Sequence, residues 1–253
     1  MAHPQTRKDH GVAQGIEEFS TLHGVRRAIV VATHPDDETL SCGGTIARLA
    51  KSGCNVYVIT VVCHETHDEA GISEPVIQGF TRAEELKQAC HILGVAGHEI
   101  LIHASEKTSL SDQHARLVRM IESGCEFSIQ RIRPQMLLIP AHGAYHQDHQ
   151  VTHAVGLSAA RDRGESHADA PRIVWGFAGP EDSWSSSVTA RNVSVDISDY
   201  HDTKTQALAA YCSQLRDMSH PRSIEGVSAL DRAAGIRSGS RYAEEFVSYR
   251  TRL

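Results

Sequence analysis

Two short polar segments of the chain combine imidazole and carboxylate side chains at a spacing that suits a metal ion. They are HPDDE at residues 34–38 and HQDH at residues 146–149. In the first, an imidazole and a carboxylate three positions apart in a tight turn can bind one ion, while the adjacent aspartate points elsewhere. In the second, two histidines three positions apart at the start of a helix share a face. Two imidazoles and one carboxylate with an open fourth position form a common catalytic zinc site.

Such a site favours hydrolytic chemistry. Water on the ion becomes a source of hydroxide near neutral pH. A carboxylate left free beside the open position can accept the proton of that water, and a spare histidine can stabilise a developing oxyanion. The two segments therefore indicate a metal-dependent hydrolase.

Each segment by itself also has a simpler interpretation. HPDDE is equally compatible with a turn that caps a helix, because aspartate is a good N-cap and acidic residues are favoured at helix N-termini. HQDH is compatible with an ordinary polar loop, since the chain contains 17 histidines. What favours the metal site is that both segments occur together, each directly after a predicted buried strand.

The remaining sequence alternates between apolar runs typical of buried strands and segments with helical spacing. The predicted strands cover residues 27–33, 55–62, 99–103, 135–140, 172–176 and 192–196, and the predicted helices cover residues 38–52, 82–93, 114–132 with an interruption near Gly124, 151–163 and 200–212. This alternation predicts an α/β fold, a Rossmann-like three-layer sandwich with a mainly parallel sheet. Ligands bind beyond the carboxyl ends of the strands in such sheets, so both polar segments are expected at one rim.

The chain is predicted to form a single domain over residues 1–253, because no repeat, low-complexity segment or linker divides it. Residues 1–25 form a polar N-terminal lead-in, with a short helical piece near residues 16–19. Residues 217–240 are rich in Ser, Gly and Arg and are predicted to form a long surface loop that influences the choice of substrate.

Composition excludes several classes of protein. The 25 basic and 31 acidic residues give a net charge of −6, which argues against charge-driven binding to nucleic acid or to an anionic membrane. No apolar run approaches the roughly 20 residues of a membrane span, and the first residues lack the apolar stretch of a secretory signal. The six cysteines form no CxxC pair. We therefore expect a cytoplasmic protein without nucleic-acid or membrane partners, for which a homo-oligomer is compatible with the sequence.

Other polar features receive simpler interpretations. Residues 63–68, CHETHD, resemble a second metal cluster and lie at the carboxyl end of the second predicted strand, from which they could face the same pocket. They lack a matching partner, however, and are interpreted as a solvated loop. A nucleotide-binding oxidoreductase is disfavoured because no GxGxxG pattern is present. Several late arginines could meet a phosphate on a substrate but are interpreted as solvated or paired, namely Arg216, Arg222, Arg232, Arg237 and Arg241.

Four stretches of the chain resemble one known family. THPDDETLSCGGTIARLAKSG at residues 33–53, followed by a strand, resembles the opening signature of the LmbE/PIG-L family of zinc-dependent N-acetylglucosaminyl deacetylases, and the later HQDH resembles its HxDH motif. TRAEELKQACHILGV at residues 81–95 is similar to a family helix. Residues 204–214 and 242–246 are similar to its late helix and its closing segment.

The resemblance implies an activity and a ligand set. The implied reaction removes the acetyl group from an N-acetylglucosamine-type amino sugar, in a small glycoside, an antibiotic or a thiol-cofactor precursor, and releases acetate and a free amine. By the matching positions, His34, Asp37 and His149 would bind Zn²⁺, with water completing the coordination. Asp36 would act first as general base and then as the acid that protonates the departing amine.

The resemblance also implies supporting residues. His146 would stabilise the tetrahedral intermediate, Asp148 would orient a histidine from behind the ligand shell, and Arg82 would contact the substrate. Some family members carry a tyrosine two positions before this histidine, but Ala144 stands there in this chain, so Tyr145 or His142 would have to assist the oxyanion instead.

Two alternatives stay open at the level of sequence. One is an amidase that cleaves a larger acyl group from a related glycoside conjugate. The absence of lysine at residues 41–44, where relatives acting on thiol conjugates carry one, favours deacetylation. The other is a metal-retaining binding protein without catalysis, which the free Asp36 argues against. Iron or cobalt could occupy the same ligands as zinc, and the sequence identifies neither the sugar nor the oligomeric state.

Overall fold

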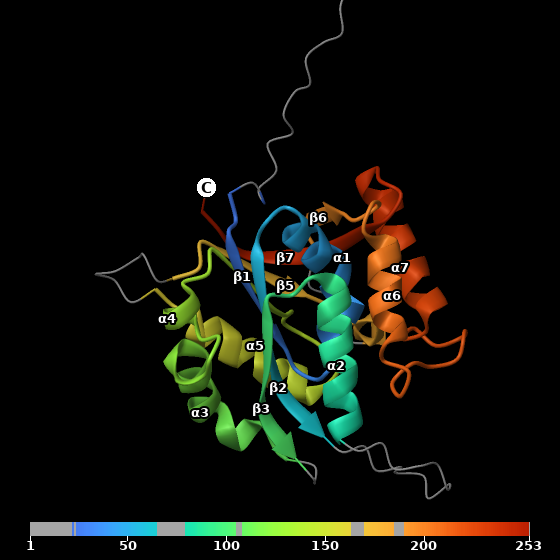
Figure 1. The fold of residues 1–253 in the computed structure, drawn as a ribbon. Helices are drawn as coiled ribbons and strands as arrows, with labels where there is room; N and C mark the ends of the chain where they lie inside the picture. The colour runs from blue at the N-terminus through green and yellow to red at the C-terminus, as the bar shows by residue number, and fades with distance from the viewer. Residues whose placement is uncertain are drawn as a thin grey trace, which may run out of the picture.

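The computed structural model describes residues 22, 24–64, 79–104, 108–162, 170–184 and 190–252. At its centre is a seven-stranded sheet of order β3-β2-β1-β4-β5-β7-β6 (Figure 1). The strands are β1 Arg27–Ala32, β2 Asn55–His64, β3 Gly97–Ala104, β4 Met136–Pro140, β5 Ile173–Phe177, β6 Val193–Asp196 and β7 Ala243–Thr251. β1 to β5 pair in parallel, and β7 pairs antiparallel with both β5 and β6. The predicted α/β fold with a mainly parallel sheet is confirmed.

Helices cover both faces of this sheet (Figure 1). The longer ones are α1 Asp37–Lys51, α2 Gly79–Leu93, α5 Gln147–Ala159, α6 His201–Ala209 and α7 Ile224–Ser238. The helix predicted over residues 114–132 is interrupted as expected, because it divides into α3 His114–Arg119, a π-helical turn η2 Met120–Gly124, and α4 Ile129–Ile132. Two 3₁₀ turns are η1 Ser111–Gln113 and η3 Pro180–Trp184.

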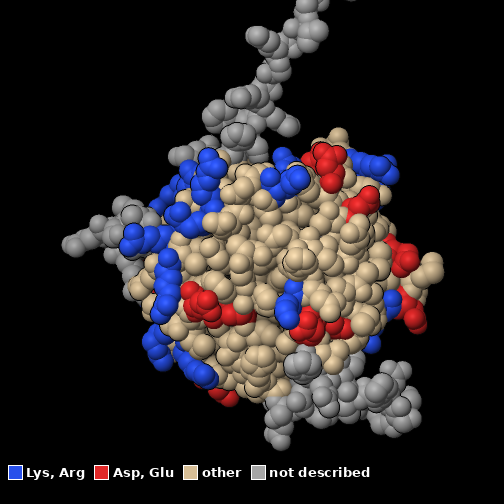
Figure 2. Space-filling view, viewed as in Figure 1, with Lys and Arg blue, Asp and Glu red and all other residues tan. Residues whose placement is uncertain are grey.

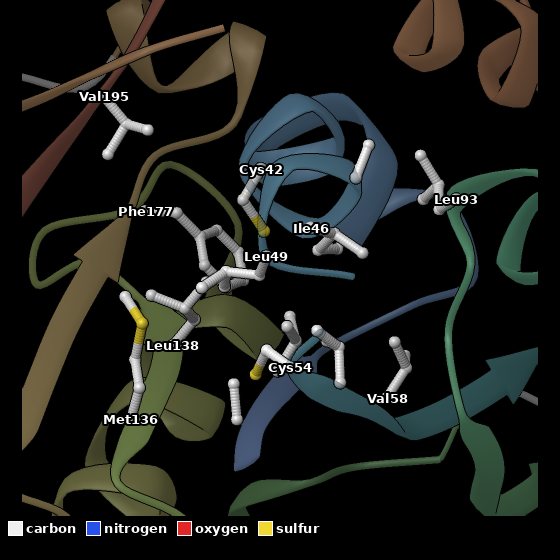
Figure 3. Packing of buried hydrophobic residues seen from close by; sticks show 14 of the residues in the cluster. Cys42, Ile46, Leu49, Cys54, Val58, Leu93, Met136, Leu138, Phe177 and Val195 are labelled. Atoms are coloured by element: carbon white, nitrogen blue, oxygen red, sulfur yellow. The ribbon is translucent and has the colours of Figure 1, made fainter. Parts of the chain in front are cut away.

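Alternate residues of β1 face two separate apolar cores. Ala28 and Val30 pack into a core shared with α1, α2 and α6, whereas Ile29 and Val31 pack into a core shared with α3 and α5. Figure 3 shows the first core, with Ile46 and Leu49 of α1 lying over the sheet. Because side chains of a strand alternate between its faces, a strand covered on both faces is apolar throughout. This double burial fixes the strand ends from which the polar segments emerge.

The prediction of a long loop over residues 217–240 is wrong, because residues 224–238 form the helix α7. The side chain of Ser223 caps this helix by accepting the N–H of Gly226, and Gly239 ends it with a φ of 81°. The glycines inside the helix reflect close packing. A Cβ at Gly226 would lie 2.6 Å from the carbonyl oxygen of His220, and one at Gly235 would lie 2.7 Å from that of Arg241. The Ser- and Gly-rich composition therefore belongs to a capped, tightly packed helix.

Other expectations fall outside what the structure tests. Most of the lead-in at residues 1–25, including the expected helical piece near residues 16–19, lies outside the described residues, and the single-domain organisation stays a prediction. Within the described ranges, no helix is long and apolar enough to cross a membrane. Figure 2 shows basic and acidic side chains together on one face of the molecule, so charge of a single sign does not cover that face. The absence of nucleic-acid partners stays a prediction.

Candidate active site

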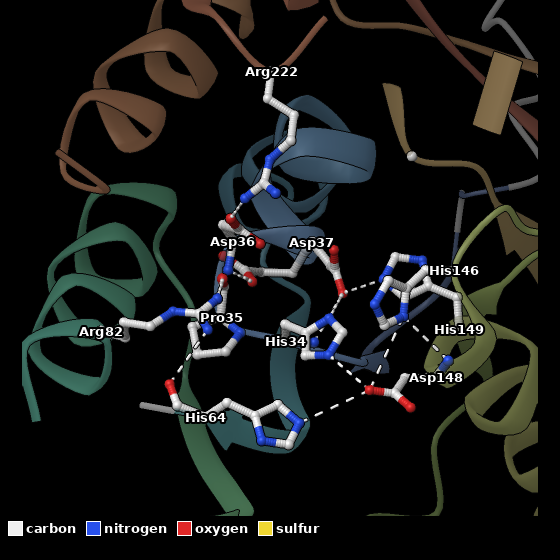
Figure 4. A network of polar contacts seen from close by, with 12 residues as sticks. His34, Pro35, Asp36, Asp37, His64, Arg82, His146, Asp148, His149 and Arg222 are labelled. Carbon is white, nitrogen blue, oxygen red and sulfur yellow. Dashed lines mark hydrogen bonds and ion pairs between the residues drawn. The ribbon is translucent and has the colours of Figure 1, made fainter. Parts of the chain in front are cut away.

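The two polar segments meet at one edge of the sheet. β1 and β4 are neighbouring parallel strands, and each is followed by one of the segments. α1 and α5 begin there, with Asp36 and His146 at their N-cap positions. Residues 34–38 and 146–149 therefore come together at the rim that the strand order predicts (Figure 4).

Three side chains at this rim offer donor atoms around a common point. One ring nitrogen of His34, one of His149 and a carboxylate oxygen of Asp37 all lie within 4.8 Å of one another. Oδ2 of Asp37 is 3.2 Å from Nε2 of His149 and 3.7 Å from Nδ1 of His34. The same oxygen accepts the backbone N–H of His34 at 2.8 Å, which fixes the carboxylate in place. Two imidazoles and one carboxylate fit Zn²⁺ with an open fourth position.

The charges of these three groups respond to one another. Burial acts to lower the pKa of His149, but the Asp37 carboxylate outweighs it and raises that pKa to about 9. Burial likewise acts to raise the pKa of Asp37, and His149 and His34 instead hold it below its usual range. For His34, burial dominates and lowers the pKa to about 4. Without a cation, protonated His149 balances the buried carboxylate, which is the role a metal ion would take over.

Asp36 lies next to these donors but is held differently. It is 3% exposed and adopts a left-handed φ of 108°, unusual for a residue with a side chain. Its carboxylate makes no capping hydrogen bond to α1 and instead contacts the guanidinium of Arg222. Burial raises the pKa of Asp36 to about 6, while Arg222 opposes that rise. A carboxyl that titrates near neutral pH is suited to act as both base and acid.

His146 faces the same space from the start of α5. Its Nδ1 accepts the backbone N–H of Asp148 at 3.2 Å. In a neutral imidazole whose Nδ1 accepts, the proton is on Nε2, so that nitrogen is a hydrogen-bond donor. The ring centroid lies 5.3 Å from that of His34, and the side chain is 45% exposed. His146 is therefore able to donate a hydrogen bond toward a ligand above the three metal donors.

Asp148 lies behind His34, opposite the predicted metal position. Its Oδ2 is 3.3 Å from Nε2 of His34, whose Nδ1 faces Asp37. Burial acts to raise the pKa of Asp148, and the contact with His34 outweighs it and lowers that pKa. A carboxylate bonded to the outer nitrogen of a ligating histidine fixes its tautomer and ring orientation. The orienting role of Asp148 stays a prediction, and this contact is the one it would use.

His64 corrects the interpretation of residues 63–68 as a solvated loop. It is the last residue of β2, its side chain is 14% exposed, and its Nε2 lies 3.8 Å from Oδ2 of Asp148. His34, His64 and Asp148 form a second group of donor atoms within 4.8 Å of one another. Residues 65–68 lie outside the described part of the chain. β2 lies beside β1, and His64 reaches the rim from the carboxyl end of β2, as its position after the second predicted strand suggested.

Arg82 is buried and bonds to the backbone of both neighbouring segments. Its guanidinium donates to the carbonyl oxygen of Pro35 at 3.2 Å and to that of His64 at 3.5 Å. It therefore ties the turn after β1 to the end of β2, and it also lines the pocket described next. Its predicted contact with substrate stays a prediction.

A pocket of about 240 Å³ opens over these residues. Tyr145 lies in its wall and is 55% exposed, whereas His142 is not among the described residues that line it. Tyr145 is therefore better placed than His142 to assist an oxyanion. Sequence reasoning missed several lining residues, namely Leu40, Gly179, Pro180, Glu181, Asp182 and Gln214, and interpreted two others, Arg216 and Arg222, as solvated or paired.

A second set of buried charges lies beneath α1. Nζ of Lys204 is 2.9 Å from Asp231 and 2.8 Å from Glu244. The Glu244 carboxylate accepts the N–H groups of Gly44 and Thr45, at 2.9 and 2.8 Å. α1 is kinked at Cys42, where φ is −147°, so Glu244 caps the second half of the helix. The late segments that resemble the family thus support the helix that carries Asp37.

Comparison with known families gives one match over this region. The profile of the PIG-L family, described as GlcNAc-PI de-N-acetylase, matches residues 29–160. That range includes both polar segments and ends at the close of α5.

Comparison with individual proteins extends the match over most of the chain. A 1D-myo-inositol 2-acetamido-2-deoxy-alpha-D-glucopyranoside deacetylase of Thermomonospora curvata is 29% identical over 227 residues, which cover 81% of this chain and 69% of that protein. The crystal structure of the conserved protein TT1542 from Thermus thermophilus superposes with a TM-score of 0.66 at 26% identity, covering 90% of this chain and 96% of that one.

The same fold also occurs in an enzyme of another class. GalB, a 4-carboxy-2-hydroxymuconate hydratase of Pseudomonas putida KT2440, superposes with a TM-score of 0.67 at 19% identity, covering 90% of this chain and 98% of that one. At this identity the likeness concerns the fold alone. The reaction must therefore be argued from the residues of the site.

Proposed function

Because the chain belongs to the PIG-L family, we propose that it is a metal-dependent N-deacetylase that removes the acetyl group from an N-acetylglucosamine-type amino sugar in a small glycoside. The products are acetate and the free amine. The metal we propose is Zn²⁺, held by His34, Asp37 and His149. The observation that carries the proposal is the convergence of these three donors beside a buried carboxylate, Asp36, that is not part of the donor group.

The residues divide the work of amide hydrolysis. Bound Zn²⁺ supplies a Lewis acid for the acetamide carbonyl and lowers the pKa of the attacking water. Asp36 accepts the proton of that water and later donates it to the departing amine nitrogen. An amide needs this second transfer, because without it the nitrogen would have to leave as a strongly basic amide anion, whereas the protonated nitrogen leaves as a neutral amine. A pKa of about 6 lets Asp36 hold either charge state at neutral pH.

The other polar residues of the site stabilise negative charge on the substrate or hold a zinc ligand in place. His146 donates from Nε2 to the oxygen that becomes negative in the tetrahedral intermediate. Asp148 holds the ring of His34 through its outer nitrogen. Tyr145 and Arg82 line the pocket, and Tyr145, which is exposed, is the more available of the two to the sugar.

The test uses the purified chain, stripped with a chelator and reloaded separately with Zn²⁺, Fe²⁺ and Co²⁺. Each preparation is incubated with N-acetylglucosaminides that differ in their aglycone, and released acetate is measured. We expect metal-dependent acetate release. A matched panel with longer acyl groups in place of acetyl separates deacetylation from the rival amidase. Release of longer acids in preference to acetate would favour the amidase, and tight metal and sugar binding without any release would favour a binding protein.

A further inference from the structure

Asp36 occupies a capping position without acting as a cap. Aspartate at an N-cap normally accepts a hydrogen bond from the N–H of the second or third helical residue. Here the backbone of Asp36 makes the turn alone, since its carbonyl oxygen accepts from Thr39 and Leu40 at 3.1 and 2.9 Å. Its own N–H donates to Glu38 at 3.2 Å. Its φ of 108° is left-handed, and its carboxylate makes no capping hydrogen bond to α1.

Arg222 is the partner that this carboxylate has instead. The contact joins residues 186 positions apart, and Figure 4 shows the guanidinium approaching Asp36 from the side away from His34. Arg82, a buried arginine nearby, donates instead to the carbonyl oxygens of Pro35 and His64. A charge-assisted contact to a planar guanidinium fixes a carboxylate in direction as well as in charge.

The backbone that carries Arg222 is itself well fixed. The N–H of Arg222 donates to Nδ1 of His220 at 3.1 Å, and the N–H of Ser223 donates to the carbonyl oxygen of His220 at 2.9 Å. Ser223 then caps α7 through Gly226. The side chain of Arg222 is 20% exposed and lines the pocket. A guanidinium on such a support can hold a second group in one orientation.

We propose that Arg222 is a positioning residue, which holds the Asp36 carboxylate turned toward the space above His34, Asp37 and His149. This inference rests on the proposed function, in which Asp36 is the proton carrier. Proton transfer requires the carboxylate to lie within hydrogen-bond reach of the reacting atoms. Arg222 acts through Asp36 and contributes no proton of its own.

The experiment compares Arg222→Gln and Arg222→Lys with the zinc-loaded wild type. We expect kcat of Arg222→Gln to fall about 10- to 100-fold, the cost of misplacing a catalytic group by about 1 Å, with KM little changed. Zinc content should match the wild type, because Arg222 touches none of the three donors. Arg222→Lys should recover part of the loss, since it keeps the charge without the planar geometry. Arg237→Gln is the matched control, because Arg237 pairs with Glu245 on the exposed face of α7.

Crystal structures of the zinc-loaded wild type and Arg222→Gln give a readout independent of substrate. We expect the Asp36 carboxylate to leave its wild-type orientation in the variant. An unchanged carboxylate, a wild-type kcat, or an equal loss in Arg237→Gln would each overturn the inference. If the wild type releases no acetate from any substrate, the proposed function fails, and the orientation of Asp36 still decides whether Arg222 positions it.

Discussion

Two groups of buried charges flank α1, and they differ in how closely their members are paired and in whether they line the pocket. The buried cluster consists of Lys204, Asp231 and Glu244, and the lysine is fully buried between carboxylates at 2.8 to 3.0 Å. The pocket cluster consists of His34, Asp36, Asp37, His64, Asp148 and His149. Its histidine–carboxylate contacts are longer, from 3.2 to 3.8 Å, and neither ring nitrogen of His64 makes a hydrogen bond within the described residues.

The difference separates two uses of buried charge. A buried ion whose contacts are all made within the protein ties segments together, as Lys204 and Glu244 tie α6 and β7 to α1. A buried group with remaining donor or acceptor capacity beside a pocket is available to a ligand. Burial and charge are common to both clusters, and Oδ2 of Asp231 also lacks a hydrogen bond within the described residues. What distinguishes the candidate site is that most of its members line the pocket and that its contacts are longer.

The largest expected effect comes from Asp36→Asn in the pocket cluster. Asparagine keeps the size and a hydrogen-bond acceptor for Arg222 but cannot carry the proton. We expect kcat to fall by about 100- to 10,000-fold, the usual contribution of a general acid–base group, while zinc content is retained. Metal analysis and acetate release on the same preparation measure both. Wild-type turnover in this variant would eliminate the assigned role.

Lys204→Met tests the buried cluster, for which we expect a loss of stability where Asp36→Asn causes a loss of activity. Removing one member of a buried ion group leaves the others uncompensated, so we expect the free energy of unfolding to fall by about 3–5 kcal/mol. The control is Lys87→Met, because Lys87 pairs with Glu84 at 3.2 Å on the surface of α2. That exposed pair should contribute less than about 1 kcal/mol. Urea denaturation measures both, and equal stability of the two variants would contradict the comparison.

A smaller effect is expected from His64→Ala, which removes a member of the pocket cluster that is not one of the three proposed zinc ligands. His64 contacts Asp148, which in turn holds His34. Loss of a partner behind a metal ligand weakens metal binding by about 10- to 100-fold, and we expect the lower end because His64 acts through Asp148. Competition with a chelator measures the affinity. His91→Ala, an exposed change on α2, serves as control, and equal affinities would remove His64 from the site.

The smallest effect concerns His153, a buried histidine outside both clusters. Its Nδ1 lies 2.9 Å from the carbonyl oxygen of Pro140, and burial lowers its pKa from the usual 6.5. As the pH falls below 6.5, His153 takes up a proton in the unfolded chain before it does so in the folded chain, and this favours unfolding. Stability should be full above that pH and fall as the pH drops toward the lowered value, by at most about 1.4 kcal/mol per pH unit for one histidine.

His153→Gln keeps a donor for Pro140 and cannot titrate. Unfolding free energies of the wild type and this variant, measured from about pH 7 to about pH 5, should converge as the pH falls. Parallel pH curves would show that His153 does not carry this dependence.

The parts of the site that the sequence predicts are those set by local pattern. The apolar runs of β1 and β4 fix where residues 34–38 and 146–149 emerge, and parallel neighbours bring them together. Arg222 and Glu244 lie 186 and 200 positions from their partners on α1, and no local spacing encodes such contacts. The sequence did not predict α7, because Gly226 and Gly235 suggest a flexible loop. In the structure each glycine allows a close approach of another backbone segment.

The sequence also did not predict β7, because the contacts that stabilise this strand come from distant parts of the chain. Its sequence AEEFVSYRT interrupts the apolar pattern with two acids, yet Glu244 is buried and bonded to the backbone of α1. A charged residue inside a strand normally argues against burial. Lys204 of α6 and two backbone N–H groups of α1 compensate its charge, and all of these contacts depend on the assembled fold.

The kink of α1 has a consequence for engineering. Residues 29–160 carry every proposed zinc ligand, but the carboxylate that secures the second half of α1 and the arginine on Asp36 come from beyond that range. A chimaera that joins residues 29–160 to the later half of a distant homologue would retain the donor set and lose its alignment. Redesign of substrate choice should therefore exchange individual pocket-wall residues and leave the two halves of the chain together.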